Sequence, residues 1–274
     1  MYKLVLEDKA GNALSLTDRK EYSVLDIQGL NPPSSKINTS ETATGDGGRY
    51  HSSKLNMRNI LVQFSINFDV EKSRTALYRV IHSKQYIKIK YTNETFDVYA
   101  EGYVESFDID YFSQKQLVTL SILCANPYWK KDVTTKYTSK TKLQNNGQVA
   151  CGFTCTLSLK SVSLKSIKIS DGTKEFLLSS EKNAYSRAMS QGDIITVHTE
   201  RNQRYATLTG GSETLNATID LYHNVVHNSW LQLQVGENNI AIECTDTSGH
   251  VLTASEMSTK MDINFTYSQL YEGV

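Results

Sequence analysis

The sequence carries no excess of charge, no long apolar run and little proline. Its 29 Lys and Arg residues balance its 29 Asp and Glu residues, so the formal net charge of the 274-residue chain is zero. A dedicated nucleic-acid-binding protein usually has a basic excess, so specific nucleic-acid binding is not expected. No stretch approaches the roughly 20 apolar residues of a membrane span, and the first residues lack a signal-peptide core. We therefore expect a protein that is made in the cytoplasm and has no membrane segment.

Cysteine is also scarce, with four residues in the chain: Cys124, Cys151, Cys155 and Cys244. A long chain without a signal sequence does not need disulfides to fold, so free and mostly buried thiols are expected. Cys151 and Cys155 lack the second ligand pair of a structural zinc site. His223 and His227 could chelate a metal on a helix, but the local pattern is not helical. The sequence predicts no metal and no cofactor.

The chain contains no motif of a common enzyme class. It has no GxSxG, no P-loop and no GxGxxG after a strand, and TGDGGRY at 44–50 lacks the lysine of a phosphate loop. Asp108 and Asp110 alternate on an expected strand and so face the same side. Such a pair could do acid–base work across a cleft, but acids on the solvent face of a strand are far commoner. The sequence favours a protein that is not an enzyme.

Alternation of apolar and polar residues dominates the chain. Clear examples are YIKIKY at 86–91, WLQLQV at 230–235, NIAIEC at 239–244 and MDINFTY at 261–267. In the first example, Ile87 and Ile89 share one face while Lys88 and Lys90 share the other. This period is typical of half-buried strands with an apolar inner face. The fold is therefore predicted to be mainly β.

One stretch, DVEKSRTALYRVIHSK at 69–84, has helical spacing instead. Val70, Leu77 and Ile81 lie near one face of a helix, and Asp69 can cap its N-terminus. The sequence predicts a single amphipathic helix here.

The composition changes near residue 130. The strand-like stretch at 117–124 runs into Asn126 and Pro127, and the proline ends it because it cannot donate to a ladder. The Thr-, Lys- and Ser-rich stretch KKDVTTKYTSKTK that follows has the composition of a linker or a connecting strand. We predict an N-terminal domain over residues 1–130 and a C-terminal domain over residues 131–274.

The second half of the chain has a further all-β pattern. The expected strands are 149–159, 164–170, 174–179, 193–199, 204–209, 216–222, 230–236, 239–245 and 261–267. Glycine turns separate several of them, as at Asp171-Gly172 and Gly210-Gly211. Short antiparallel strands with glycine turns predict a β-sandwich or a jelly roll.

The segment from Leu25 to Ile66 starts and ends like a strand but is polar in between. The polar stretch includes Pro32, Pro33, Gly45, Gly47 and Gly48. A compact domain rarely keeps a loop of this length without a function. Because the stretch has little apolar content, its order must come from backbone hydrogen bonds to another element. The alternative is a disordered surface loop.

Several segments, in this order, resemble the distal tail proteins of long-tailed phages, the siphovirus tail-component family. They are YSVLDIQGLNPPSSKINTS, DGGRYHSSKLNMRNILVQFSI, RTALYRVI, YAEGYVESFDIDYF, LVTLSILCANPYWK and FTYSQLYEGV. The first 130 residues carry most of the resemblance. In the second half it lies mainly in MDINFTYSQLYEGV and in the LQVGENNIAIE turn.

The resemblance implies an N-terminal, β-barrel-like oligomerisation domain with one helix, followed by a galectin-like β-sandwich. Copies would form a ring, typically a hexamer, with the strands at 55–66 and 117–124 in its wall. Such a ring joins the tail tube protein to the tail-tip hub protein, and in many phages it anchors receptor-binding proteins. The expected location is the tail tip of the virion, after synthesis in the cytoplasm of the bacterial host.

By position, the loop from Asn31 to Arg49 would be a belt around the neighbouring subunit. Its two prolines would stiffen the exit from the strand, and its glycines would allow a reversal. The residues assigned to this inter-subunit belt are Asn31, Pro32, Pro33, Ile37, Thr39, Gly45, Asp46, Gly47, Gly48 and Arg49.

Two other functions stay open beside the ring. The C-terminal sandwich could bind carbohydrate in a tail or cell-surface assembly, with Tyr205, Tyr222 and Trp230 as glycan contacts, although the sequence favours a packing role for these aromatics. A hydrolase using Asp108 or Asp110 would lack an identifiable nucleophile or partner acid. The ring fits the neutral charge, since a strongly basic wall would bind the DNA that passes through a tail.

Overall fold

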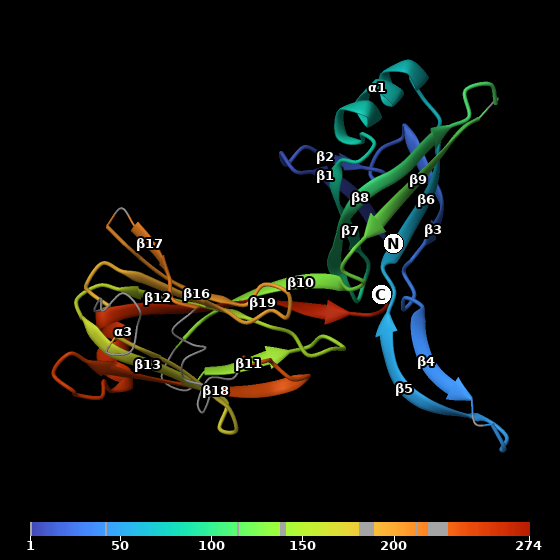
Figure 1. Cartoon of the computed structure of the whole chain (residues 1–274). Helices are drawn as coiled ribbons and strands as arrows, with labels where there is room; N and C mark the ends of the chain where they lie inside the picture. The colour runs from blue at the N-terminus through green and yellow to red at the C-terminus, as the bar shows by residue number, and fades with distance from the viewer. Residues whose placement is uncertain are drawn as a thin grey trace. The chain divides into compact units, whose positions relative to one another are not determined.

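The computed structural model describes residues 2–41, 43–113, 115–137, 141–180, 189–211, 213–218 and 230–274. The chain divides into two compact units (Figure 1). Unit 1 comprises Met1–Lys131 and Tyr271–Val274, and unit 2 comprises Asp132–Leu270. The end of the chain thus returns to unit 1. That residues 1–130 and 131–274 are separately folding domains stays a prediction.

Unit 1 is built around one antiparallel sheet with the strand order β3-β6-β9-β8-β7-β1-β2. The strands of unit 1 are β1 (Lys3–Asp8), β2 (Ala13–Ser15), β3 (Tyr22–Gln28), β4 (Ser35–Glu41), β5 (Gly48–Leu55), β6 (Arg58–Ile66), β7 (Tyr86–Thr92), β8 (Asp97–Ile109) and β9 (Gln116–Cys124). A further strand, β10 (Trp129–Lys136), starts in this unit and pairs with β8 at Lys130 opposite Tyr99. The end strands β3 and β2 do not pair with each other, so the predicted barrel-like sheet is open.

The alternation seen in the sequence positions the core of unit 1. Ile87 and Ile89 of β7 are fully buried, whereas Lys88 and Lys90 on the other face stay partly exposed. The buried face belongs to a cluster that also contains Trp129, which is fully buried. Burial of this apolar area stabilises the unit by about 25 cal/mol for each Å² removed from water.

The predicted helix is present as α1 (Val70–Val80), and Leu77 and Val80 are among its buried residues. The Tyr22 hydroxyl donates to the carbonyl oxygen of Ser73 at 2.8 Å, which ties the helix to β3. The predicted side-chain cap by Asp69 is wrong, because no cap hydrogen bond forms. Asp69 has a φ of 44°, in the left-handed region, and a capping side chain normally needs an extended backbone to reach the first amides.

Unit 2 has two antiparallel sheets, with the orders β17-β16-β15-β12-β19 and β11-β18-β13-β14. Its elements are β11 (Thr141–Asn145), β12 (Thr154–Leu159), β13 (Leu164–Ser170), β14 (Glu175–Ser179), β15 (Ile194–His198), β16 (Tyr205–Gly210), β17 (Glu213–Asn216), β18 (Gly236–Asp246), α3 (Ala254–Lys260) and β19 (Met261–Tyr271). One apolar cluster combines buried residues from both sheets. The predicted mainly β fold is confirmed, while a specifically galectin-like sandwich stays a prediction.

Some details of unit 2 differ from the sequence expectations. The expected strand at 230–236 is wrong: Leu233 makes only an isolated bridge to Cys151. Leu231 and Leu233 are nonetheless buried. The alternation therefore predicted their burial correctly, although their backbone does not join a sheet. Helix α3 was not expected. Of the expected strand at 216–222, Asn216 ends β17, and residues 219–229 lie outside the described part of the chain.

Candidate assembly site

The polar segment between β3 and β6 is a two-stranded hairpin. Strands β4 and β5 pair from Ser35 opposite Leu55 to Glu41 opposite Gly48 and form a sheet of their own. The expectation of a loop from Asn31 to Arg49 is therefore wrong, because Ser35–Glu41 pair with Gly48–Leu55. Leu55, expected to begin the ring wall, belongs to β5 instead. Figure 1 shows this hairpin projecting from the rest of unit 1, and we call residues 35–55 the arm.

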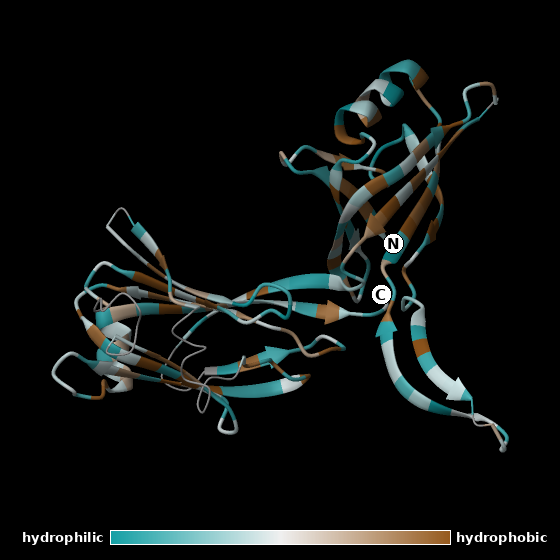
Figure 2. Ribbon diagram, in the orientation of Figure 1, coloured by the Kyte–Doolittle hydropathy of each residue, from teal (hydrophilic) through white to brown (hydrophobic). Residues whose placement is uncertain are grey.

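The described residues of the arm are almost all exposed. Every residue of β4 is exposed, and within β5 only Leu55 is half-buried; Figure 2 shows a largely hydrophilic ribbon. Ile37 is 59% exposed and Tyr50 is 60% exposed. The Tyr50 hydroxyl bonds Ser53, which lies opposite Ile37, so these two large side chains share a face. An isolated hairpin is only marginally stable in water, which makes this arm a candidate for burial by a partner.

A buried arginine holds the base of the arm, which consists of residues 29–33, Arg58 and residues 272–274 and which we call the root. Arg58, the first residue of β6, is 2% exposed. Its guanidinium donates to four backbone carbonyl oxygens, those of Pro127 at 2.7 Å, Asn31 at 2.8 Å, Glu272 at 2.5 Å and Gly29. Its Cζ atom lies 5.7 Å from the centroid of the Trp129 indole. Desolvation by burial lowers the pKa of Arg58, and the carbonyl oxygens supply the polar contacts that a buried cation needs.

Residues at the end of the chain complete the root. The Val274 amide donates to the carbonyl oxygen of Leu30 at 3.1 Å. A Cβ atom added to Gly273 would lie 2.9 Å from Cδ of Pro32. That separation is too short for a side chain at this position, so glycine allows the two segments to pack closely.

The structure divides the predicted belt residues between the root and the arm. Asn31, Pro32 and Pro33 lie in the root, Ile37 and Thr39 on β4, Gly45, Asp46 and Gly47 in the turn, and Gly48 and Arg49 on β5. Gly47 has a φ of 89°, so the chain reversal does use a glycine. The role of these residues between subunits stays a prediction.

The sequence reasoning missed Arg58 and residues 272–274 as parts of the root. The sequence did contain one indication for Arg58. Alternate residues of a strand face the same side, so Arg58 lies on the side of β6 that carries the buried Ile60, Val62 and Phe64. A cation at an inward position must find polar partners. The sequence does not show that these partners lie as far away as Glu272.

The strands expected in a ring wall are neighbours. β6 and β9 pair in antiparallel register from Arg58 opposite Cys124 to Ile66 opposite Gln116. Their inward residues other than Gln116 are buried, as Val62 is. Their place in a ring stays a prediction.

The two candidate catalytic acids lie on an exposed hairpin. Asp108 is exposed on β8, and Asp110 accepts a hydrogen bond from the Phe112 amide at 3.4 Å in the following turn. This is the arrangement of solvent-facing acids. Within the described residues, no group of three or more His, Cys, Asp or Glu side chains is placed to hold a metal. His223 and His227 lie outside those residues.

The prediction of free, buried thiols is confirmed for all four cysteines. Burial raises the pKa of Cys124 to about 11 and that of Cys151 to about 12. It also raises the pKa of Cys155, and it raises that of Cys244 to about 12. These thiols are poor nucleophiles because the thiolate is disfavoured.

The candidate glycan contacts lie in unit 2. Tyr205 is 38% exposed and stacks on His198 with 4.9 Å between ring centroids. Trp230 packs against the core beside Phe176, with Arg204 over its ring. Tyr222 lies outside the described residues. Trp230 therefore has the packing role that the sequence analysis set beside the glycan role, and the glycan contacts stay a prediction.

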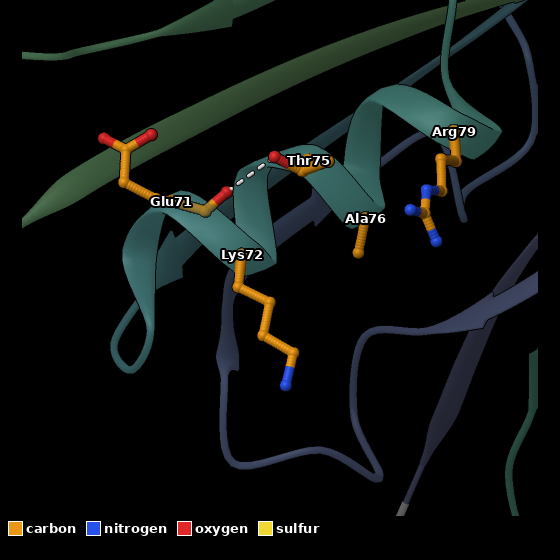
Figure 3. Close-up of a pocket in the computed structure, with 5 residues that line it drawn as sticks. All are labelled: Glu71, Lys72, Thr75, Ala76 and Arg79. Atoms are coloured by element: carbon orange, nitrogen blue, oxygen red, sulfur yellow. Dashed lines mark hydrogen bonds between the residues drawn. The ribbon is translucent and has the colours of Figure 1, made fainter.

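A hollow on unit 1 is lined by residues of α1 alone: Glu71, Lys72, Thr75, Ala76 and Arg79. Figure 3 shows Lys72, Ala76 and Arg79 pointing to the same side of the helix. The Thr75 hydroxyl donates to the Glu71 carbonyl oxygen at 2.8 Å, a bond internal to the helix (Figure 3). The lining lacks a paired acid and base or an activated nucleophile, so this hollow offers no catalytic arrangement. Among the described residues, no helix is both long and apolar enough to span a membrane.

The family comparison points to the unit that carries the arm. Residues 9–124 match the model described as the phage tail protein RIFT-related domain. This range includes the arm, Arg58 and β9. No curated protein matches the chain in sequence.

Solved structures resemble the chain over its whole length. The Dit (gp 19.1) protein of phage SPP1, described as a paradigm of the hub adsorption apparatus in phages infecting Gram-positive bacteria, gives a TM-score of 0.66 at 16% identity, covering 97% of this chain and 98% of that one. Two structures of the phage p2 baseplate in its activated conformation, with Ca and with Sr, give TM-scores of 0.54 and 0.53 at 9% identity, with full coverage of both chains. At these identities the likeness is one of fold.

Proposed function

We propose that this chain, whose residues 9–124 belong to the phage tail protein RIFT-related domain family, is a structural hub protein of a phage tail tip or baseplate. The resemblance to distal tail proteins inferred from the sequence is confirmed by this family and, in fold, by the Dit protein of phage SPP1. The chain is accordingly a component of the virion tail, made in the bacterial host.

In this proposal, copies of the chain form a ring, and the number of copies is six. The arm supports the proposed ring, because it projects from the rest of unit 1 with Ile37 and Tyr50 about 60% exposed. An arm that docks on a neighbour creates a heterologous interface, and such interfaces close into rings when the rotation between copies allows it. Burial of Ile37 and Tyr50 then stabilises both the arm and the ring.

The ring would join the tail tube protein to the tail-tip hub protein and, in some tails, hold receptor-binding proteins. Neutral overall charge suits a ring through which DNA passes, because a basic lining would retain the phosphate backbone. We propose no catalytic activity for it. The solvent-facing positions of Asp108 and Asp110 and the raised pKa values of the cysteine thiols support this view.

The mass of the full-length protein in solution tests the ring. Light scattering and negative-stain images are expected to show closed rings of about six copies. A variant with residues 34–56 replaced by a short glycine-serine linker is expected to be monomeric, with the circular dichroism of a folded β protein. Rings formed by the arm-less variant would contradict the role of the arm. A wild-type monomer, even with tail tube and tail-tip proteins added, would contradict the hub.

A second candidate is carbohydrate binding by unit 2 during host adsorption. The exposed Tyr205 stacked on His198 is the observation that favours it, because sugar rings pack on exposed aromatic faces. Binding on a glycan array that is lost in Tyr205→Ala would support this candidate. Absence of binding, or binding that Tyr205→Ala leaves unchanged, would remove it.

A further inference from the structure

The arm has a basic face. Lys36 lies directly opposite Lys54, and Arg49 lies opposite Ser40 further along the same face. The hydrogen bonds from Asn38 to Ser52 and between His51 and Ser40 confirm which side chains share this face. Like charges opposite each other on a hairpin are destabilising.

The cations of the arm have no internal counter-charge. Within the described residues, Lys36, Arg49 and Lys54 form no ion pair with a carboxylate. The two acids of the segment, Glu41 and Asp46, lie near its tip. The repulsion between the two opposed lysines is therefore uncompensated in one copy, which points to an acidic surface elsewhere.

The sheet of unit 1 has a matching acidic face. The outward positions of β3, β6, β9 and residues 103–109 of β8 include the carboxylates of Asp26, Glu105 and Asp108. The only lysine or arginine in these strand segments is Arg58, which is buried and committed to the arm root. These strand segments therefore place carboxylates, and no exposed lysine or arginine, on their outward side.

Two of the carboxylates of this face have uncharged partners. Glu105 accepts hydrogen bonds from Asn59 and Ser121, and Asp26 accepts one from Gln28. Exposed apolar side chains stand among them, with Leu25 60% exposed and Leu117 44% exposed. A surface with these properties is suited to a basic partner that also has aliphatic stems to pack on it.

The register gives the two faces similar spans. Asp26 pairs with Gln63, Gln63 with Thr119, and Thr119 with Asp108, so one cross-strand row links the two aspartates. Three inter-strand gaps of about 4.8 Å give about 14 Å between its ends. On the arm, Lys36 and the partner of Arg49 are four residues apart, which is about 13 Å at 3.3 Å per residue.

We propose that the basic face of the arm of one copy docks on the acidic face of a second copy, with Lys36, Lys54 and Arg49 against Asp26, Glu105 and Asp108. This inference rests on the proposed ring and names the surface that receives the arm. The opposite face of the arm, with Ile37 and Tyr50, is then buried by a further element of the ring, and this burial stabilises the docked arm. The complementary charges set the order in which copies join, because a like-charged surface repels the arm.

Charge reversal and re-pairing test this interface in the full-length protein. We compare the arm variant K36E/K54E, the face variant E105K/D108K, and a variant that combines all four changes. The control is K9E/K20E, which makes the same change of charge at two exposed lysines outside the arm and the sheet face. Thermal melts verify that each variant is folded.

In the arm variant and in the face variant, the protein concentration at which half of the chains are assembled should rise by at least about tenfold. Sedimentation measures this concentration. The combined variant is expected to recover rings, and the control to match the wild type. Raising the salt from about 50 mM to about 500 mM should weaken wild-type assembly, since screening shortens the reach of these charges.

Two results would overturn the inference: single-surface variants that form rings at wild-type concentrations, or a folded combined variant that stays monomeric. Failure of the proposed function would look different, because the wild-type protein itself would then form no rings. Mixing the arm variant with the face variant adds an independent readout. In that mixture the acidic arm of one variant matches the basic face of the other, and the basic arm matches the acidic face, so rings of alternating variants are expected. A mixture that stays monomeric would count against this docking.

Discussion

The Arg58 guanidinium donates a hydrogen bond to the carbonyl oxygen of Glu272 at 2.5 Å, across 214 residues of sequence. The same side chain bonds the carbonyl oxygens of Gly29 and Asn31, where the chain leaves β3 for the arm. Unit 1 is therefore complete only after the chain has passed through unit 2 and returned. The root of the arm is held by residues near the end of the chain as well as by its own strands.

Replacement of Arg58 should destabilise unit 1. Arg58→Met leaves several buried carbonyl oxygens without a donor, so the free energy of unfolding should fall by about 3 kcal/mol. The control Arg49→Met removes an exposed cation of the arm and should change the monomer by less than about 0.5 kcal/mol. Trp129 packs beside Arg58, and in a Trp230→Phe background its fluorescence reports unit 1 alone during denaturant unfolding. Equal stability of the two variants would contradict the structural role of Arg58.

Alanine substitutions at two glycines of positive φ should distinguish the cost of backbone strain from the cost of steric overlap. Gly29 has a φ of 92°, and a Cβ atom there would lie 2.5 Å from the Asn59 carbonyl oxygen. Gly47 has a φ of 89° with no other atom within 4 Å of such a Cβ. Gly47→Ala should cost about 1 kcal/mol from the left-handed backbone alone. Gly29→Ala should cost at least about 2 kcal/mol more, and unfolding curves of similar midpoint for both would refute this difference.

The sequence predicted a helix or a strand correctly where the spacing of apolar residues within that element is regular. Alternation at 86–91 predicted the buried Ile87 and Ile89, and helical spacing predicted α1. Both patterns record burial against a local core, which any single strand or helix reports without knowledge of its partner. The same reasoning misread 230–236, where Leu231 and Leu233 are buried although the backbone joins no ladder.

The arm and its root could not be read in this way. The strands β4 and β5 have no buried face, so the alternation of Ile37 and Thr39 carried too little contrast to mark a strand. Their pairing across a glycine turn was the missed signal, because Gly47 supplies the positive φ that hairpin turns favour. The contacts of Arg58 depend on residues far away in the sequence, and one sequence contains no record of such proximity.

The buried cysteines should be unreactive in the folded protein. Burial raises the pKa of Cys124 to about 11 and that of Cys244 to about 12, so almost no thiolate is present near pH 8. Ellman's reagent should label no native thiol within minutes and all four after denaturation. As a control, Lys9→Cys adds an exposed thiol outside the arm and the sheet face, which should react at once. Rapid labelling of a wild-type cysteine would mean that its unit opens more readily than the structure implies.

Glu256 should titrate far below an ordinary carboxylic acid. Its Oε2 atom accepts hydrogen bonds from the Thr253 amide at 2.8 Å and the Thr253 hydroxyl at 2.9 Å, in a capping box at the start of α3. These bonds, with smaller contributions from His250 and Lys260, lower the pKa of Glu256 from 4.5 to about 2. Because the folded-state pKa is the lower one, the stabilisation is fully present above pH 4.5 and is lost as the pH falls toward 2.

The titration of Glu256 can be followed through its side-chain carboxyl carbon by NMR. Thr253→Val removes the hydroxyl donor and should raise the pKa of Glu256 toward its ordinary value, with an earlier loss of α3 on acidification. Thr259→Val is the matched control, since the Thr259 hydroxyl bonds the carbonyl oxygens of Ser255 and Glu256 and leaves the carboxylate alone. A wild-type midpoint near 4.5, or equal shifts in the two variants, would show that the capping box does not hold this carboxylate in solution.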